Sequence, residues 1–281
     1  MTDYSLEGLF GIKDRVAVIT GGGGVLCGEM ARALAALGAK VAILDLEKKA
    51  AEGVAGEITH AGGTAKGLEG DVLETESLVR ARDAILEDWG RIDILINGAG
   101  GNHKTATTGG TSVADQVDPT FFDLSGDGVQ FVFNLNFLGT LLVTQVFGKP
   151  MVDEDSGNII NISSMNAFTP LTKIPAYSAA KAAVSNFTQW LSVHFAPANV
   201  RVNAIAPGFF LTAQNRFLLL DEATEQPTPR GQTIIDHTPM RRYGEPADLV
   251  SSLVWLVGPG ARFVTGTVVP VDGGFAAFSG V

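Results

Sequence analysis

The chain has 281 residues, of which 46% are hydrophobic and 18% are charged, and its formal net charge is −10 at pH 7. This size and balance predict one compact domain over residues 1–281 and exclude a disordered chain. The negative charge argues against nucleic acid or an anionic membrane as the main partner, although local cations could still bind a small anion. The sequence shows no leader-like segment and no uninterrupted apolar run of the roughly 20 residues that span a bilayer.

The composition also bounds metal and redox chemistry. A single cysteine, Cys27, excludes an internal disulfide framework, so a reducing cytoplasm is the expected compartment. The four histidines, at positions 60, 103, 194 and 237, have no ligand spacing, and no catalytic metal is expected.

Short β-rich apolar runs alternate with amphipathic stretches along the chain. The expected strands are Val16–Thr20, Val41–Leu44, Thr64–Leu68, Ile92–Asn97, Asn158–Ser163, Val200–Ala206 and Thr267–Val271. The expected helices are Cys27–Leu37, Glu47–His60, Glu74–Trp89, Gly128–Phe147, Pro175–Ala196 and Glu245–Val257. Continuous apolarity is typical of parallel strands that are covered on both faces. The order therefore predicts an α/β fold, a doubly wound parallel sheet with helices on both faces.

Two long segments interrupt this alternation. Residues 100–127 are rich in glycine and threonine, and residues 209–243 combine charges, prolines and irregular patterning. Both follow expected strands, and the ligand crevice of an open α/β sheet lies beyond the carboxyl ends of its strands. We expect them to be substrate-side loops, the second partly helical and able to close, with surface decoration as the alternative.

A glycine-rich segment, Thr20–Gly28, joins the first expected strand to the first helix. Such a turn brings backbone amides and the positive end of a helix close to a pyrophosphate, and glycine permits its backbone angles. We expect a dinucleotide to contact Gly21, Gly24, Val25 and Leu26. Glycine clusters also serve ordinary turns, so this signal needs support from a second feature.

That support comes from Asp45, which ends the second expected strand. A carboxylate there can accept hydrogen bonds from the adenosine ribose and would repel a 2′-phosphate. Leu46 supplies no compensating cation, so NAD is favoured over NADP. Lys48 and Lys49 are expected on the solvated face of the next helix.

Other strand ends are expected to complete the nucleotide pocket. Asp71 and Val72 follow the third strand, and the segment Asn97–Gly100, which includes Ala99, follows the fourth. Both segments are expected at the rim of an adenine and ribose pocket. Asp71 could instead cap the helix that follows it.

A second group of residues can move a proton at a carbonyl oxygen. Tyr177 and Lys181 are four residues apart and would share one face of a helix. The ammonium is expected to lower the pKa of the phenol from its usual value near 10, and it could also hold ribose hydroxyls. Ser164 could bind the substrate oxygen, and Asn136 could bind a water that links Lys181 to solvent. Each feature alone is common, but their conjunction predicts hydride-transfer chemistry.

These motifs resemble those of the short-chain dehydrogenase/reductase family over nearly the whole chain. The matching segments are Thr20-Gly21 with its glycine cluster, Asp71, Asn97–Gly100, Asn136, Ser164, Tyr177, Lys181, Asn203–Gly208 and Thr265–Gly274. The resemblance implies a seven-stranded Rossmann sheet, usually a homotetramer, with Asn136, Ser164, Tyr177 and Lys181 as the catalytic set. It also assigns Tyr177, Lys181, Pro207, Gly208, Phe210 and Thr212 to the cofactor site, with Thr212 at the nicotinamide carboxamide.

The glycine turn departs from the family pattern. That pattern would place glycines at positions 25 and 27, where this chain has Val25 and Cys27. A valine does not comfortably adopt positive φ, and cysteine is larger than the usual contact residue. We expect the turn to use Gly24 and Gly28 in their place, with the backbone slightly shifted.

A narrower resemblance points to the D-mannonate oxidoreductase (fructuronate reductase) subgroup. It rests on Gly21–Gly28, Gly100–His103, Ser163–Lys173 and Pro207–Thr212. It implies interconversion of D-fructuronate and D-mannonate, a sugar-acid substrate, with NAD. Asn102, His103, Asn166 and Gln214 offer partners for hydroxyl groups, and Lys104, Lys173, Arg216 or Arg241 could bind a carboxylate.

Two other functions stay open. One is a reductase of the same fold that acts on a neutral polyol, a steroid-like alcohol or an acyl ketone, which Phe121, Phe122, Phe209 and Phe210 would suit. The other is a catalytically silent NAD-binding regulator, which the altered glycine turn slightly favours. The presence of Ser164 together with the Tyr-Lys pair weighs against the regulator.

Overall fold

A seven-stranded, all-parallel sheet forms the centre of the chain. In the computed structural model, residues 4–212 and 215–280 are described. The strands are β1 (Val16–Thr20), β2 (Lys40–Asp45), β3 (Thr64–Glu69), β4 (Ile94–Asn97), β5 (Gly157–Ile162), β6 (Val200–Pro207) and β7 (Val268–Val271). Their order across the sheet is β3-β2-β1-β4-β5-β6-β7, with every pair parallel. The doubly wound α/β fold predicted from the sequence is confirmed, with each strand within two residues of its expected ends.

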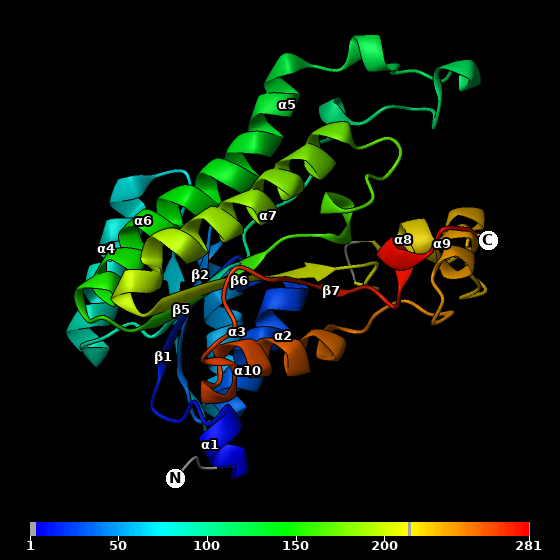
Figure 1. Ribbon diagram of the computed structural model, residues 1–281. Coiled ribbons are helices and arrows are strands. Elements are labelled where there is room, and N and C mark those ends of the chain that lie inside the picture. The colour runs from blue at the N-terminus through cyan, green and yellow to red at the C-terminus, as the bar shows by residue number, and fades with distance from the viewer. Residues whose placement is uncertain (1–3, 213–214, 281) are drawn as a thin grey trace.

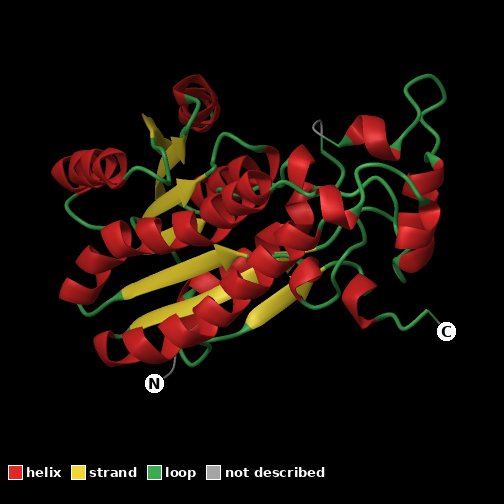
Figure 2. Cartoon of the chain, turned by 90° about the horizontal axis from the view of Figure 1, so that it is seen from above, coloured by secondary structure: helices red, strands yellow, loops and turns green. Residues whose placement is uncertain are grey.

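Helices cover both faces of this sheet (Figures 1 and 2). They are α1 (Leu6–Phe10), α2 (Val25–Ala36), α3 (Lys48–His60), α4 (Thr75–Trp89), α5 (Gly126–Phe133), α6 (Gly139–Asp153), α7 (Pro175–Phe195), α8 (Arg216–Leu219), α9 (Pro229–His237) and α10 (Val250–Val257). Side chains of α2, α3 and α10 pack in one core cluster, and those of α4, α6 and α7 pack in the other. The short helices α1, α8 and α9 were not individually expected.

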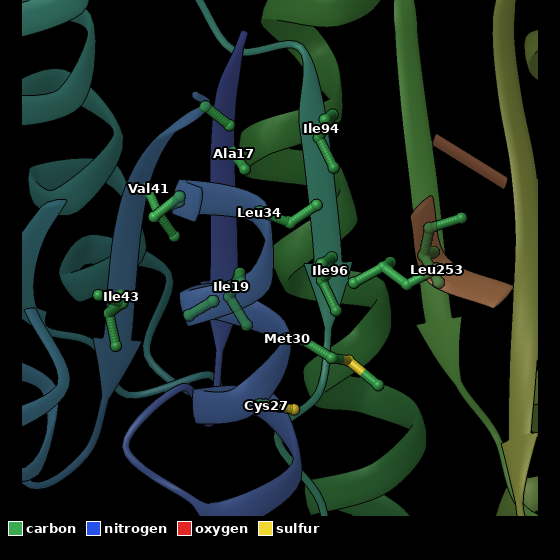
Figure 3. Close-up of a cluster of buried hydrophobic side chains, with 14 of the residues drawn as sticks. Ala17, Ile19, Cys27, Met30, Leu34, Val41, Ile43, Ile94, Ile96 and Leu253 are labelled. Carbon is green, nitrogen blue, oxygen red and sulfur yellow. The ribbon is translucent and has the colours of Figure 1, made fainter. Parts of the chain in front are cut away.

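Strand β1 is covered by side chains on both faces, which explains its continuously apolar sequence. Ala17 and Ile19 pack toward Met30 and Leu34 of α2 (Figure 3), while Val18 packs in the cluster on the opposite face. Successive strand side chains point to opposite faces, so a strand covered on both sides must be apolar throughout. Each of these side chains is fully buried.

The helical run Gly126–Asp153 contains α5, a π-helical turn at Asn134–Leu138 and α6. By length and composition alone it could cross a membrane, although polar residues such as Asn134, Asn136 and Gln145 interrupt its apolar sequence. Half of its most apolar window is buried inside the protein, where α6 packs on the sheet. Its apolarity is therefore explained by its position in the core.

The carboxyl ends of the strands meet at one edge of the sheet, and both irregular segments emerge there. We call residues 104–125 the arm; it extends beyond α5 at the upper right of Figure 1. The arm contains three 3-10 turns. Two of them begin with a capping box, in which Ser112 pairs with Asp115 and Thr120 pairs with Asp123. The segment 209–243 contains α8 and α9, which confirms that it is partly helical.

Candidate active site

A pocket of about 520 Å³ lies at the carboxyl edge of the sheet, where the sequence predicted a dinucleotide. It is lined by most of the predicted cofactor residues, namely Gly21, Gly24, Val25, Leu26, Asp45, Asp71, Val72, Ala99, Tyr177, Lys181, Gly208, Phe210 and Thr212. These residues come from strand ends that are far apart in the sequence. The parallel sheet brings them together because all its strands end at the same edge.

The glycine turn is close-packed at Gly21. Gly21 has a φ of +63°, and a Cβ there would lie 2.9 Å from Cα of Ala99. Gly24 precedes the first turn of α2, and Val25 is the first residue of that helix. Val25 therefore needs no left-handed conformation, and its half-exposed side chain lines the pocket. Gly28 does not line the pocket, but a Cβ there would lie 3.3 Å from the carbonyl oxygen of Gly22, and its amide donates to the carbonyl of Gly24, so the use of Gly24 and Gly28 by the turn stays a prediction.

The side chain of Cys27 fits beside Gly98 because glycine has no Cβ. A Cβ on Gly98 would collide with Sγ of Cys27. The thiol is buried, and burial raises its pKa to about 12. Cys27 is thus a packing residue in the wall of the pocket, matched to Gly98.

The carboxylate of Asp45 is fixed by two backbone amides. Oδ2 accepts a hydrogen bond from the amide of Gly23 at 3.0 Å, and Oδ1 accepts one from the amide of Glu47 at 3.1 Å. Its neighbour Leu46 is largely exposed and also lines the pocket. The pocket therefore has an anionic group at the end of β2, with no cation in the adjacent lining.

Two predicted cofactor residues do not line this pocket. Asn97 is buried in β4, where Nδ2 donates to Oγ1 of Thr144 at 2.9 Å and to Oδ1 of Asn161 at 2.8 Å. It ties β4 to β5 and α6, so the prediction that it lies at the rim is wrong. Pro207 is buried at the end of β6. Gly98 and Gly100 line the pocket, as expected for their segment. The lining residues that sequence reasoning missed are Cys27, Leu46, Gly70, Leu135, Ile162, Phe209 and Asn215.

The phenol of Tyr177 and the hydroxyl of Ser164 meet beside the pocket. Ser164 follows β5, and Tyr177 is in the first turn of α7, which starts at Pro175. The prediction that the pKa of Tyr177 is lowered is wrong: burial raises it, and the hydrogen bond with Ser164 offsets only part of that rise. The phenol therefore keeps its proton at neutral pH.

Lys181 lies one turn along α7 from Tyr177, as the spacing predicted. Its Nζ is 5.7 Å from the centre of the Tyr177 ring and donates to the carbonyl of Ile162 at 2.7 Å. The residue is only 4% exposed, and burial lowers the pKa of its amine to about 8. The ammonium is thus held at the floor of the pocket and titrates near neutral pH.

Asn136 is fully buried in the π-helical turn between α5 and α6. Its Nδ2 donates to the carbonyls of Gly101 at 2.7 Å and Val132 at 2.8 Å, and its Oδ1 accepts from the amide of Gly101 at 3.2 Å. A Cβ on Gly100 would lie 2.6 Å from Oδ1 of Asn136 and 3.1 Å from Nζ of Lys181. The side chain therefore fixes the turn that adjoins Lys181, and its role in a water relay stays a prediction.

The predicted substrate residues are dispersed, and none of those described lines the pocket. Asn102 donates to Oγ1 of Thr107, and His103 caps the turn that follows it. Arg216 forms an ion pair with Glu225 at 2.6 Å. Asn166 is buried two residues after Ser164, and its Oδ1 has no hydrogen-bond partner among the described residues. Gln214 lies outside the described residues.

The described residues, 4–212 and 215–280, contain no group of three His, Cys, Asp or Glu side chains that could hold a metal ion. Tyr177, Ser164 and Lys181 bring a phenol, a hydroxyl and an amine to the site. Such a set can give a proton to, or take one from, an oxygen bound between Ser164 and Tyr177.

The chain belongs to the short-chain dehydrogenase family. The family model described as short chain dehydrogenase matches residues 15–223, which include the glycine turn, Asp45, Ser164, Tyr177 and Lys181.

Two curated relatives are similar over 96% of this chain. An "Uncharacterized oxidoreductase" of Haemophilus influenzae is 53% identical with 96% of its own length covered, and "Uncharacterized oxidoreductase UxuB" of Bacillus subtilis is 52% identical with 98% covered. A crystal structure from Haemophilus influenza, described as a "putative D-Mannonate oxidoreductase" with bound NAD, is 52% identical. It superposes with a TM-score of 0.90 over 96% of this chain and 98% of its own.

Proposed function

We propose that this chain is an NAD-dependent oxidoreductase that interconverts a keto-hexuronate and an aldonate, specifically D-fructuronate and D-mannonate. The observation that carries the activity is one pocket lined by Asp45, Tyr177 and Lys181, with the buried hydroxyl of Ser164 hydrogen-bonded to the phenol of Tyr177. Family membership and the solved relative with bound NAD support the cofactor. The solved relative described as a "putative D-Mannonate oxidoreductase" supports the substrate.

The pocket fits NAD by its shape and by its charge. The packing of Gly21 against Ala99 leaves backbone, with no side chain, at the turn where a pyrophosphate would approach the start of α2. The fixed carboxylate of Asp45 would accept ribose hydroxyls and disfavour a 2′-phosphate. Thr212 and Gly208 lie at the β6 end and would hold the nicotinamide end.

The residues can complete the reduction of a ketone. When bound, NADH supplies the hydride that adds to the ketone carbon. Ser164 donates a hydrogen bond to the ketone oxygen, and Tyr177 transfers its phenolic proton to that oxygen as negative charge develops. The raised pKa of Tyr177 keeps this proton available at neutral pH, and the nearby ammonium of Lys181 stabilises the phenolate that remains. Oxidation of the alcohol reverses these transfers.

Initial rates of NADH oxidation test the proposal. We expect turnover of D-fructuronate with NADH, weaker turnover with NADPH, and a much lower kcat/KM for D-fructose, which has a hydroxymethyl group in place of the carboxylate. Activity only on other ketones would overturn the substrate and leave the mechanism. A lack of activity on uronates, neutral ketoses and acyl ketones would favour the silent NAD-binding regulator.

A neutral or greasy ketone is the second candidate, and exposed aromatic side chains favour it. Phe121 and Phe122 on the arm and Phe168 after Ser164 are exposed on the substrate side of the sheet. Steroid-like or acyl substrates would bury such rings. The same panel of rates separates this candidate from the sugar acid.

We also propose that the enzyme is a cytoplasmic homotetramer. The outer face of α7 supports assembly, because Trp190 and Val193 are 56% and 77% exposed and Trp190 stacks on His194 at 4.7 Å. Exposed apolar patches of this kind mark protein contacts. Light scattering should give about four times the chain mass, and Trp190→Glu should lower it; a monomeric parent protein would contradict the assembly.

A further inference from the structure

We propose that Lys173 is the residue that binds the carboxylate of the substrate, and this inference rests on the proposed sugar-acid reductase activity. Lys173 lies on the segment that runs from Ser164 to Tyr177, four residues before the phenol. Lys173 therefore lies on the stretch of chain that joins Ser164 to Tyr177, the two residues that would contact the ketone oxygen. A hexuronate carries its carboxylate only a few carbon atoms from its ketone.

The backbone of Lys173 is unusual for a lysine. Its φ is +72°, in the left-handed region that favours glycine. Three other long side chains in this region are Gln116, Glu225 and Arg241. Glu225 and Arg241 use their side chains in ion pairs, with Arg216 and Asp236. A lysine in a glycine conformation costs stability, which suggests that its side chain serves a purpose that glycine could not.

Lys173 is a half-buried residue, and its ammonium forms no hydrogen bond or ion pair within the described ranges 4–212 and 215–280. The chain has 30 acidic and 20 basic residues, so acidic partners are plentiful. The other cations considered for the carboxylate differ from it. Arg216 and Arg241 are already paired, and Lys104 is exposed on the arm.

Contacts on both sides hold this segment in place. The carbonyl of Lys173 accepts a hydrogen bond from the amide of Thr108 on the arm at 2.8 Å. Earlier in the segment, Oγ1 of Thr169 donates to the carbonyl of Ala276 near the C-terminus at 3.4 Å. The strained residue is thus fixed between the arm and the rest of the substrate side. A cation carried on a backbone that is held in this way suits recognition of an anionic group.

The test compares D-fructuronate with D-fructose in the parent enzyme, Lys173→Met and Lys104→Met. We expect Lys173→Met to raise KM for D-fructuronate roughly 10- to 100-fold with little change in kcat, because the carboxylate is bound equally before and during the reaction. Its kcat/KM for D-fructose should stay within threefold of the parent value, and Lys173→Arg should recover much of the affinity. Lys104→Met should behave like the parent enzyme with both substrates.

A second variant distinguishes a loss of carboxylate binding from a loss of protein stability. Lys173→Gly relieves the left-handed conformation, so it should unfold at the same temperature as the parent protein or higher. It should nevertheless lose the preference for D-fructuronate and bind the product D-mannonate more weakly as an inhibitor. If both variants keep the parent ratio of kcat/KM values and the parent inhibition by D-mannonate, Lys173 does not bind the carboxylate. If the parent enzyme itself shows no preference for the uronate, the proposed substrate and the role of Lys173 both fail.

Discussion

The two ends of the active site are built in different ways. At the nucleotide end, backbone amides and strand-end side chains of β1 to β4 form the pocket, as in the hydrogen bonds that fix Asp45. At the substrate end, the arm contacts the segment after Ser164 through the hydrogen bond from the amide of Thr108 to the carbonyl of Lys173, and residues 209–243 contain the short helices α8 and α9. The geometry at a sheet edge is set by the backbone of the parallel strands, whereas the conformation of an irregular segment depends on particular side chains. We expect cofactor binding to tolerate changes that abolish substrate recognition.

The largest effect is expected at the junction of the two ends. Tyr177→Phe removes the proton donor and should lower kcat/KM about 10³- to 10⁴-fold, while NADH binding measured by fluorescence stays within a few-fold of the parent value. Ser164→Ala should also lower turnover, since it removes a donor to the ketone oxygen. Turnover of Tyr177→Phe close to that of the parent enzyme would exclude the phenol as the acid.

A smaller effect is expected from the carboxylate at the nucleotide end. Asp45→Ser keeps a side-chain oxygen near the amide of Gly23 but removes the charge that would face a 2′-phosphate. The ratio of kcat/KM with NADH to that with NADPH should fall roughly 100-fold. Glu47→Ala, which changes a neighbouring carboxylate outside the pocket, is the control and should leave the ratio unchanged. An unchanged ratio in Asp45→Ser would show that another feature selects the cofactor.

The burial of Lys181 predicts that the free energy of unfolding depends on pH. Burial lowers its pKa from 10.5 to about 8, so between these values the unfolded chain binds more protons at this group than the folded one. Its contribution to the free energy of unfolding therefore rises with pH, by about 2 kcal/mol between pH 8 and pH 10. Lys181→Met should lack this rise in urea unfolding curves measured across that range. Parallel pH profiles for the two proteins would contradict the buried ammonium.

The smallest expected effect concerns packing under the glycine turn. Gly98→Ala should destabilise the protein by about 2 kcal/mol, because its new methyl group meets Sγ of Cys27. Cys27→Gly should relieve the part of that loss that comes from Sγ, as measured by thermal unfolding of the double variant, while the contact of the new methyl group with the carbonyl oxygen of Thr20 remains. Additive effects of the two changes would show that the residues are not matched.

Several features of the nucleotide end could be predicted from the sequence because parallel strands end at one edge. The end of β2 at Asp45 and the spacing of Tyr177 and Lys181 needed only local pattern and helix periodicity. Asn97 was misplaced because an asparagine at a strand end resembles a rim residue, while its hydrogen bonds to Thr144 and Asn161 depend on tertiary packing. The pKa of Tyr177 was predicted in the wrong direction for a similar reason, because burial is not visible in the spacing.

The substrate end was harder to predict because its contacts are not periodic. The sequence treated Arg216 and Lys173 as equal candidates for a carboxylate. Only the fold shows that Arg216 is paired with Glu225 and that Lys173 has a left-handed backbone. The match of Cys27 to Gly98 is likewise a contact between segments that are distant in the sequence.

The measurement that tests the central claim most directly is deuteride transfer from [4-²H]NADH to D-fructuronate, followed by NMR of the product. The account predicts D-mannonate with deuterium on the carbon that had been the ketone carbon, and almost no product from the Tyr177→Phe enzyme. Unlabelled product, a different alcohol, or NADH that remains unoxidised would contradict the proposed reaction.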